Sequence, residues 1–568
     1  MSSDRACGLI DLLRDRAAEQ PNDPAFTFLD DGEAAGASLT WRALERRSRA
    51  IGAAISRRVD PGARVLVMCP PSIDFVPAFL GVLYAGAVAV PAYPPTGGRA
   101  DRTLDRLNGM IADAGVSLIV GPSGLRRLPP ATNSMAGDPP DLPWLDPENV
   151  CDEQAGDWRL PSLSADSLAF LQYTSGSTSA PRGVMVSHAN LLHNLAETHR
   201  DARYTRESVS VSWLPINHDM GLINGVLQPV FSGGRAYLMA PATFLQRPAR
   251  WLQAISRYGG THSGGPNFAY DLCVRRVTEK DAASLDLSSW TVAYNGSEPV
   301  RRSTLDAFQA RFGVCGFRWD AMSPAYGLAE STLLVASVPA GVPPQFRGEA
   351  VASGILPGDG SRVVIVDPST RRRLPDATAG EIWVSGPSVA LGYWNRMEQT
   401  AETFRAYASD GSGPFLRTGD LGLIHNRRLF VTGRIKDILI VRGVKHYPQD
   451  IEVTAERAHP ALRPGCCAAV GVDSRGEERI AVVAELQSRE HARAEALDLA
   501  QVVIAIRIAV GSAHHVSLSS VSLVRAGTLP KTTSGKLQRF LCREALTDGT
   551  LQPVASWTDG EMADRVAS

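Results

Sequence analysis

A short loop rich in hydroxyl groups and glycines lies in the stretch QYTSGSTSAPRGV, residues 172–184. The apolar run SLAFLQY before it predicts a buried strand, and SHANLLHNLAE after it has helical apolar spacing with Ser187 as N-cap. A glycine-rich turn between a strand and a helix offers backbone N–H groups and hydroxyl donors, which suits polyphosphate oxygens. The pattern is not a nucleoside-triphosphatase P-loop, and a polar surface loop is the alternative. The candidate ligand residues are Thr174, Ser175, Gly176, Ser177, Thr178 and Arg182.

Two later segments add further candidate groups. AYNGSEP, residues 293–299, turns through Gly296, where a planar ring could lie on the backbone. AYGLAEST, residues 325–332, places Glu330 shortly after Tyr326. A single carboxylate beside a phosphate loop is a ligand set that Mg²⁺ prefers, because the ion keeps waters and takes phosphate oxygens. Alternatively, the glycine serves an ordinary turn and the carboxylate caps a helix.

Two more segments lie nearer the C-terminus. RTGDLG, residues 417–422, is expected to present Asp420 in a tight turn, where the carboxylate could accept hydrogen bonds from a ribose diol. PKTTSGKLQR, residues 530–539, carries Lys536 in a Gly/Ser loop, and a lysine there supplies a mobile positive charge. A helix cap and a solvated surface lysine are the alternatives for these two residues.

Together these segments resemble the adenylate-forming superfamily of acyl-CoA synthetases, peptide-synthetase adenylation domains and luciferases. The resemblance is carried, in order, by YTSGSTSAPRGV, NGSEP, YGLAEST, RTGDLG, GRIKDILIVRG and PKTTSGKLQR. Within that superfamily, SWLPINHDMGLINGVLQPVF, FLQRPARWLQAISRYGGTHSGGPNFAYDLC and RGVKHYPQDIE resemble the fatty acyl-AMP ligases.

The resemblance implies that the hydroxyl-rich loop holds the β- and γ-phosphates of ATP and that Glu330 holds Mg²⁺. Arg182 replaces a lysine that is commoner in this loop, and we expect it to keep the same function as a charge. The remaining nucleotide-binding residues would be Gly296, Ser297 and Tyr326 at the adenine and Asp420 and Arg434 at the ribose.

The resemblance also assigns residues to the chemistry and to the acyl group. His218 would lie where the acyl carboxylate enters, and Lys536 would bridge the carboxylate and the α-phosphate during adenylation. Lys436 would be the hinge about which a small domain rotates between the two half-reactions. Asn224 stands where related sequences often have glycine, and with Gly225 it would line the acyl pocket, unless it merely faces a neighbouring helix.

The implied reaction is ATP-dependent activation of a fatty acid or related carboxylic acid to acyl-AMP with release of pyrophosphate. The acyl group would then pass to the phosphopantetheine thiol of an acyl carrier protein, expected to be a separate chain because little sequence follows residue 546. One alternative is an acyl-CoA ligase, because segment 336–362 is shorter than the insertion associated with poor use of coenzyme A. A non-catalytic adenylate-binding protein is another.

Alternating strand and helix patterns predict an α/β fold with helix-covered sheets. We expect a large, multi-subdomain N-terminal adenylation domain at residues 1–435 and a small, mobile α+β domain at residues 436–568. A formal net charge of −1 gives no indication of nucleic-acid binding, and no C-x-x-C pair is present. The charged N-terminus is unlike a signal peptide, and no apolar run reaches ~18 residues, so a soluble cytoplasmic protein is expected.

Overall fold

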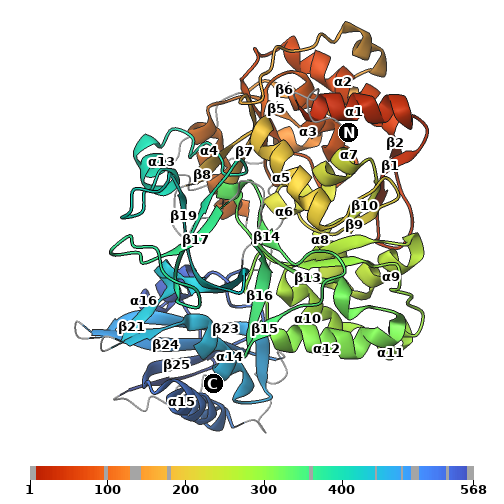
Figure 1. Ribbon diagram of the computed structural model, residues 1–568. Coiled ribbons are helices and arrows are strands. Elements are labelled where there is room, and N and C mark those ends of the chain that lie inside the picture. The colour runs from red at the N-terminus through yellow and green to blue at the C-terminus, as the bar shows by residue number, and fades with distance from the viewer. Residues whose placement is uncertain are drawn as a thin grey trace. The chain divides into compact units, whose positions relative to one another are not determined.

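The computed structural model describes residues 8–94, 100–127, 142–174, 181–356, 362–441, 444–474, 477–487, 498–531 and 537–559 (Figure 1). Its contacts divide the chain into two compact units. Unit 1 comprises Met1–Thr418 and Gly422–Val431, and unit 2 comprises Gly419–Leu421 and Thr432–Ser568. The mixture of sheets and covering helices confirms the predicted α/β class. A functional domain boundary between residues 435 and 436 stays a prediction.

A six-stranded sheet forms one part of unit 1. Its order is β6 (Trp144–Leu145), β5 (Val116–Val120), β3 (Arg64–Val67), β4 (Val88–Pro91), β7 (Leu168–Thr174) and β8 (Arg182–Ser187). The pairs are parallel except for β7–β8, which is antiparallel. Val65 and Val67 belong to one apolar cluster and Leu66 to another, so both faces of β3 are buried. Burial on both faces is the physical reason for the continuous apolar runs that predict these strands.

A larger sheet of unit 1 has a parallel part. It runs from β13 (Met322–Gly327) through β12 (Val292–Asn295), β11 (His262–Gly265), β9 (Val209–Ser212) and β10 (Arg235–Met239) to β1 (Pro24–Leu29), with β2 (Ser38–Thr40) antiparallel at the edge. The carboxyl ends of parallel strands meet at one edge of a sheet, where open α/β folds bind ligands. Residues that follow β9, β12 and β13 therefore share an edge, and these residues include His218, Gly296 and Glu330.

Beyond β13 the same sheet continues through a further set of strands. These are β14 (Leu334–Ser337), β16 (Ala350–Ile355), β20 (Arg428–Arg434), β19 (Leu416–His425), β18 (Gly380–Ser385) and β17 (Arg362–Val366), with β15 (Phe346–Arg347) on β16. The β13–β14, β14–β16, β16–β20 and β17–β18 pairs are antiparallel. The described part of the segment between β14 and β17 thus contributes the antiparallel β15–β16 pair to this sheet.

Helices cover the sheets of unit 1. They are α1 (Leu9–Glu19), α2 (Trp41–Ser56), α3 (Phe75–Tyr84), α4 (Ala100–Ala114), α5 (His188–Asp201), α6 (Asp219–Leu222), α7 (Gln228–Ser232), α8 (Pro241–Gln246), α9 (Ala249–Tyr258), α10 (Asn267–Arg276), α11 (Glu279–Ala282), α12 (Arg302–Phe312) and α13 (Met397–Phe404). In Figure 1 the green helices α9, α10 and α12 lie beside the parallel strands. A π-helix, Ile223–Leu227, joins α6 to α7.

Unit 2 is a small α+β unit, as predicted. A four-stranded sheet takes the order β23 (Leu462–Ser474), β24 (Glu477–Leu486), β25 (Leu518–Val524) and β26 (Ala555–Thr558), with a β21 (Leu439–Val441) and β22 (Val444–His446) pair. The helices are α14 (Pro448–Arg457), α15 (Leu499–His514) and α16 (Arg539–Thr547). Ile451 of α14, Ile506 of α15 and Val482 of β24 share one apolar cluster, so α14 and α15 pack on the sheet (Figure 1).

Local sequence signals predict α5 correctly. The prediction is wrong in two other details, which are the connection from the hydroxyl-rich loop to α5 and the position of Asp420. The Ser187 Oγ accepts a hydrogen bond from the Asn190 N–H at 3.1 Å, and the Asn190 Oδ1 accepts one from the Ser187 N–H at 3.1 Å, which is a capping box. The hydroxyl-rich loop does not run directly into α5, because β8 intervenes and pairs with β7. Asp420 lies inside β19 rather than in a tight turn, although Gly419 before it has a φ of +70°.

Candidate functional site

Strands β7 and β8 frame the hydroxyl-rich loop. Thr174, whose backbone alone is described, pairs with Arg182 at the open end of this hairpin. The predicted ligand residues between them, Ser175, Gly176, Ser177 and Thr178, lie outside the described residues. On the β7 side, the Tyr173 hydroxyl donates to the Asp113 Oδ2 at 2.7 Å. The strands that precede and follow the loop in the sequence are therefore paired with each other, and Arg182 is the first residue of β8.

Arg182 presents an unused donor next to the loop. Its Nε is buried and has no hydrogen-bond partner within the described ranges, while its guanidinium lies 5.1 Å from the centre of the Tyr393 ring. A cation over an aromatic face is attracted by the ring quadrupole. Leaving a buried, charged N–H unpaired is costly, so the group fits an anionic ligand such as a phosphate.

Glu330 meets the same tyrosine. The Tyr393 hydroxyl donates to the Glu330 Oε1 at 2.7 Å, and Tyr393 is only 5% exposed. Burial and the nearby Glu330 carboxylate raise the pKa of the Tyr393 phenol, so the phenol remains a proton donor at physiological pH. Glu330 itself lies in a short 3-10 helix, Ala329–Ser331, whose C-cap is Thr332, a buried residue with a φ of +64°. Backbone strain of this kind in a non-glycine residue persists where the surroundings over-determine it, often at functional sites.

Glu330 also fits a magnesium ligand by its chemistry. Among the described residues, no group of three or more His, Cys, Asp or Glu side chains is placed to hold a metal ion. Mg²⁺ needs no such cage, because it keeps several waters and binds one or two carboxylates together with substrate phosphates. A single carboxylate near the phosphate loop is consistent with that mode of binding.

The residues predicted at the adenine come from neighbouring strand ends. Asn295 of β12 pairs with Pro324 of β13, and a Cβ at Gly296 would come within 2.9 Å of the Ala325 carbonyl oxygen. Any residue but glycine would therefore press on β13 there. Tyr326, which follows Ala325 in β13, is 9% exposed. The structure thus brings Gly296 close to the strand that carries Tyr326.

Ser297 connects this region to the segment predicted to receive the acyl group. Its φ is +67°, unusual for serine, and its hydroxyl donates to the Met220 Sδ at 3.3 Å. His218 precedes that methionine, and its Nδ1 lies 2.6 Å from the Asp219 Oδ1. The predicted adenine and acyl-carboxylate positions are therefore adjacent in unit 1.

Asn224 lies in the π-helix, with an amide oxygen that is buried. The Asn224 Oδ1 has no hydrogen-bond partner among the residues that the structure describes. Gly225 is buried, and a Cβ there would approach the Ser212 Oγ of β9 to 2.9 Å, which explains the need for glycine. π-Helical turns occur frequently at functional sites. The acyl-pocket role of both residues stays a prediction.

Unit 2 holds the residues predicted for the ribose. The Arg434 Nε lies 2.8 Å from the Asp420 Oδ1, and the Asp420 side chain is 7% exposed whereas that of Arg434 is 68% exposed. Lys436, the predicted hinge, is exposed in a short 3-10 helix. Lys536, the predicted catalytic lysine, lies outside the described residues.

In unit 2, hydrogen bonds from Arg539 join the segment of the predicted hinge to α16, the helix that follows the lysine loop in the sequence. Arg539 donates to Asp437 Oδ2 at 2.7 Å and to both carboxylate oxygens of Glu452, each at 2.7 Å. Bidentate pairing of this kind is strong and geometrically specific. Together these acidic partners raise the pKa of Arg539 despite its burial.

Sequence reasoning missed Tyr393, Asp113 and Arg396. The Arg396 Nη2 donates to the Asp113 Oδ1 at 2.6 Å, and Asp113 also accepts from Tyr173, so three distant segments meet beside the loop. None of the three residues lies in the segments that carry the resemblance. The pairing of residues 391–394 with β8 brings Tyr393 to the site.

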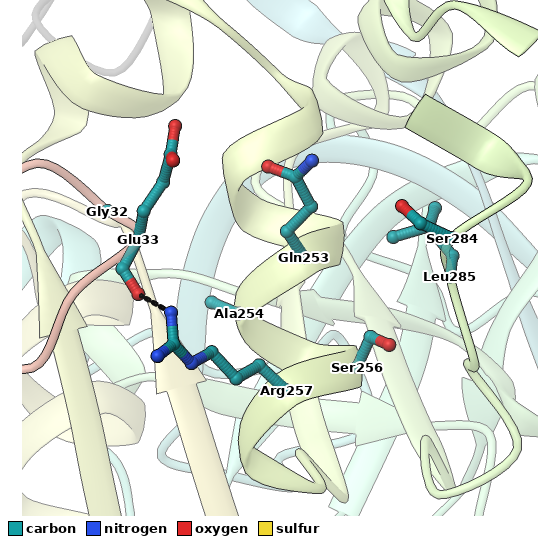
Figure 2. A pocket seen from close by; sticks show the side chains of 8 residues that line it. All are labelled: Gly32, Glu33, Gln253, Ala254, Ser256, Arg257, Ser284 and Leu285. Atoms are coloured by element: carbon teal, nitrogen blue, oxygen red, sulfur yellow. Dashed lines mark hydrogen bonds between the residues drawn. The ribbon is translucent and has the colours of Figure 1, made fainter. Parts of the chain in front are cut away.

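A separate pocket of about 320 Å³ opens elsewhere on unit 1 (Figure 2). It is lined by Gly32, Glu33, Gln253, Ala254, Ser256, Arg257, Ser284 and Leu285. The Arg257 Nη1 donates to the Glu33 carbonyl oxygen at 3.0 Å across it. None of the predicted site residues lines this pocket. The described residues include no helix that is both long enough and apolar enough to span a bilayer.

The chain matches known families and proteins along nearly its whole length. Residues 13–394 match the AMP-binding enzyme family, and residues 436–556 match the Disco-interacting protein 2-like AMP domain. The medium-chain-fatty-acid–[acyl-carrier-protein] ligase JamA of Moorena producens is 44% identical over 576 residues, covering 97% of each chain. The putative fatty-acid–CoA ligase FadD21 of Mycobacterium tuberculosis is 37% identical and covers 94% of this chain and 97% of its own length.

A solved structure agrees with these relatives. The fatty acyl-adenylate ligase of Legionella pneumophila, in complex with acyl adenylate and pyrophosphate, is 37% identical, covers 98% of both chains and has a TM-score of 0.73. The resemblance that the motifs predict is thereby confirmed. The chain belongs to the AMP-binding enzymes of the adenylate-forming superfamily, and its near relatives are fatty acyl-AMP ligases.

Proposed function

We propose that this protein uses ATP and Mg²⁺ to convert a fatty acid into acyl-AMP, with release of pyrophosphate, and then passes the acyl group to the pantetheine thiol of a separate carrier protein. The observation that carries the proposal is the meeting of Glu330 and Arg182 at Tyr393, beside the open end of the β7–β8 hairpin. This arrangement supplies one carboxylate for a cation and one guanidinium for an anion next to a hydroxyl-rich loop. The relatives support the same reaction.

In the first half-reaction, a carboxylate oxygen of the fatty acid attacks the α-phosphorus of ATP. The new bond joins that oxygen to phosphorus, and the bond to the bridging oxygen breaks as pyrophosphate leaves. Two anions must approach each other, so positioning and charge neutralisation dominate the barrier. Arg182 would neutralise phosphate charge, and Glu330 would hold Mg²⁺, which supplies the rest of that neutralisation.

Three further residues would contribute the ribose contact and the mobile charge. Asp420 would accept hydrogen bonds from the ribose hydroxyls, with Arg434 orienting its carboxylate. Lys536 would bridge the attacking carboxylate and the α-phosphate. We propose that the small domain at residues 436–568, which carries Lys536, turns about Lys436 between the two half-reactions.

The acyl group would enter beside His218 and extend past the π-helix that contains Asn224. The hydrogen bond from Ser297 to Met220 supports this route. Ser297 is predicted to lie at the adenine, and Met220 lies between His218 and Asn224 in the chain. JamA is named for medium-chain acids, and the amide of Asn224 would shorten the pocket in a way that suits such chains.

In the second half-reaction, the carrier's thiol sulfur attacks the acyl carbonyl carbon, AMP leaves, and the thiol proton passes to solvent. Carrier transfer is supported by JamA, which is named as an acyl-carrier-protein ligase. The runner-up, coenzyme A as acceptor, is supported by the name of FadD21 and by the short segment 336–362. We place the activity in the cytoplasm, which supplies ATP. A non-catalytic role is disfavoured, because Glu330, Asp420, Arg434 and Lys536 are all present.

The test is direct. Purified protein is incubated with Mg²⁺, ATP and a panel of acids from hexanoate to palmitate, and pyrophosphate and acyl-AMP are measured. Equal amounts of pyrophosphate and acyl-AMP are expected with at least one acid in the panel. Formation of ADP and phosphate instead, or of no nucleotide product with any of the acids, would contradict the proposal.

A further inference from the structure

We propose that Tyr393 is a positioning residue for adenylation: its hydroxyl orients Glu330 and its ring orients Arg182, so that one side chain sets the spacing between the magnesium ligand and the phosphate-binding cation. The inference rests on the proposed function and goes beyond it, because none of the predicted roles includes this tyrosine.

Both contacts are made by opposite parts of one buried side chain. The hydroxyl donates to the Glu330 Oε1 at 2.7 Å, and the Arg182 guanidinium lies 5.1 Å from the ring centre. The hydroxyl bond fixes one carboxylate oxygen and leaves the other for a ligand. Because the Arg182 guanidinium lies over the ring, a movement of Tyr393 would displace both the guanidinium and the Glu330 carboxylate.

The backbone around Tyr393 is fixed to the strand that carries Arg182. The Trp394 N–H donates to the Gly183 carbonyl at 2.8 Å, and the Met185 N–H donates to the Gly392 carbonyl at 2.9 Å. Residues 391–394 thus pair with β8 along the residues that follow the hydroxyl-rich loop in the sequence. The tyrosine keeps its distance from Arg182 through these main-chain bonds.

The side chain of Tyr393 is fixed as well. Its ring packs edge-on against Phe404 at 5.0 Å, and its N–H donates to the Thr400 Oγ1 at 2.9 Å. Gly392 has a φ of +138°, and a Cβ there would come within 2.3 Å of the Thr400 Cγ2. This close approach requires glycine and holds α13 against the tyrosine.

The other strand of the hairpin is tied to the same segment. Arg396 donates to Asp113, which also accepts from the Tyr173 hydroxyl of β7. The Ala390 N–H donates to the Glu330 carbonyl at 2.9 Å. The stretch from Ala390 to Arg396 therefore bonds directly to Glu330 and to β8 and is linked to β7 through Asp113, with Tyr393 at its centre. Groups held by neighbours in this way keep a productive geometry before substrate binds.

The test uses Tyr393→Phe, which keeps the ring and removes only the hydroxyl. Loss of a hydrogen bond to a charged group corresponds to about tenfold or more in an equilibrium constant. We expect the Mg²⁺ concentration for half-maximal adenylation to rise about tenfold, with the KM for the fatty acid unchanged. Calorimetric binding of Mg²⁺ with α,β-methylene-ATP should weaken to a similar extent. Tyr407→Phe, an exposed tyrosine of unit 1, is the matched control.

A second variant tests the same contact from the other side. Glu330→Asp keeps the charge but draws the carboxylate back from the tyrosine, and it should raise the Mg²⁺ requirement similarly. Combined with Tyr393→Phe, it should add little further effect, because both changes break one interaction. If both single variants kept the wild-type Mg²⁺ dependence, the inference would be overturned while wild-type acyl-AMP formation still supported the proposed function. Wild-type protein that made no acyl-AMP would instead overturn the proposed function.

Discussion

The Arg434 Nε lies 2.8 Å from the Asp420 Oδ1, and the two residues come from strands β20 and β19, which are neighbours in the sheet. The Asp420 carboxylate is almost fully buried, whereas the Arg434 side chain remains largely exposed. A buried carboxylate oriented by a guanidinium is a strong acceptor for a hydroxyl group. This pair is therefore well suited to a ribose diol.

Asp420→Ala is expected to raise the KM for ATP about 10- to 100-fold, the effect of losing hydrogen bonds to a charged group. The sharper measurement compares ATP with 2′-deoxy-ATP and 3′-deoxy-ATP. Wild-type protein should prefer ATP over at least one of these analogues, and the variant should lose that preference, because no acceptor remains for the hydroxyl. Asp548→Ala, at an exposed position of unit 2, should behave as wild type. An unchanged preference in Asp420→Ala would remove this residue from the ribose site.

Lys536→Ala is expected to lower the rate of acyl-AMP formation by ~10²–10³, because one preorganised charge partner is lost at the reacting phosphate. Transfer of the acyl group from supplied acyl-AMP should be much less affected, since that step forms no bond to phosphorus. Lys531→Ala is the matched control from the same motif, because its Nζ already bonds to the Gly465 carbonyl at 3.1 Å. Adenylation by Lys536→Ala within about twofold of wild type would show that Lys536 is a surface lysine.

The buried His262 is expected to make the folded protein less stable in acid. Burial lowers the pKa of His262 to about 4, and the neutral ring lies between the Ala202 carbonyl and the Thr261 hydroxyl. Its unfolded pKa is near 6.5, so between about pH 6.5 and 4 the unfolded chain binds more protons than the folded chain. The free energy of unfolding should therefore decrease as the pH is lowered across this window, by up to about 3 kcal/mol for this imidazole.

The measurement is the urea midpoint of unfolding at pH 7.5 and at pH 5, for wild type and for His262→Gln. Glutamine has no proton to gain, so the difference between the two pH values should shrink in this variant. His425→Gln, at a less buried position, should leave the difference unchanged. Equal pH dependence in wild type and His262→Gln would show that protonation of His262 does not control acid stability.

Asn224→Gly is expected to move acyl preference toward longer acids. The amide oxygen of Asn224 is buried without a partner among the described residues, so its removal should enlarge the pocket without breaking a hydrogen bond. Each methylene accommodated in an apolar pocket changes specificity by about tenfold or more. The ratio of kcat/KM for palmitate to that for decanoate should rise at least tenfold. An unchanged ratio would place Asn224 outside the acyl pocket.

The parts of the fold that sequence predicts well are those set by local patterns. The cap at Ser187 and the apolar spacing after it specify α5, and continuous apolar runs specify strands buried on both faces. The order of strands and the insertion of β8 depend on pairing between distant segments, which no local pattern carries. Asp420 shows the same limit, because Gly419 predicts a turn whereas pairing with neighbouring strands keeps both residues in β19.

The candidate site divides in the same way. Residues whose side chains suit a ligand and that lie within motifs, such as Glu330 and Arg434, can be named as candidates from their segments, and their roles stay predictions. Tyr393 cannot be named in this way, because it reaches Glu330 from 63 residues away through a segment with no periodic pattern. Its position is a product of main-chain bonds to β8, so only the folded structure reveals it.

The thiol that accepts the acyl group belongs either to coenzyme A or to a carrier protein. Coenzyme A needs a groove for its nucleotide end, preferably with basic or aromatic contacts, and no segment of the sequence has a pattern that indicates such a groove. A carrier protein docks through its own surface and delivers only the pantetheine arm, so it requires no nucleotide site. We therefore expect a cognate holo-carrier to outcompete coenzyme A.

The experiment starts from enzyme-bound acyl-AMP and supplies holo-carrier and coenzyme A together at saturating concentrations. Acyl-carrier should form faster than acyl-CoA, and apo-carrier, which has no thiol arm, should yield no acylated product. The comparison tests whether the short segment 336–362 permits use of coenzyme A. The described part of this segment adds two strands, β15 and β16, to the large sheet. Predominant acyl-CoA across several holo-carriers would show that this short segment permits coenzyme A to reach the adenylate, and the protein would then be an acyl-CoA ligase.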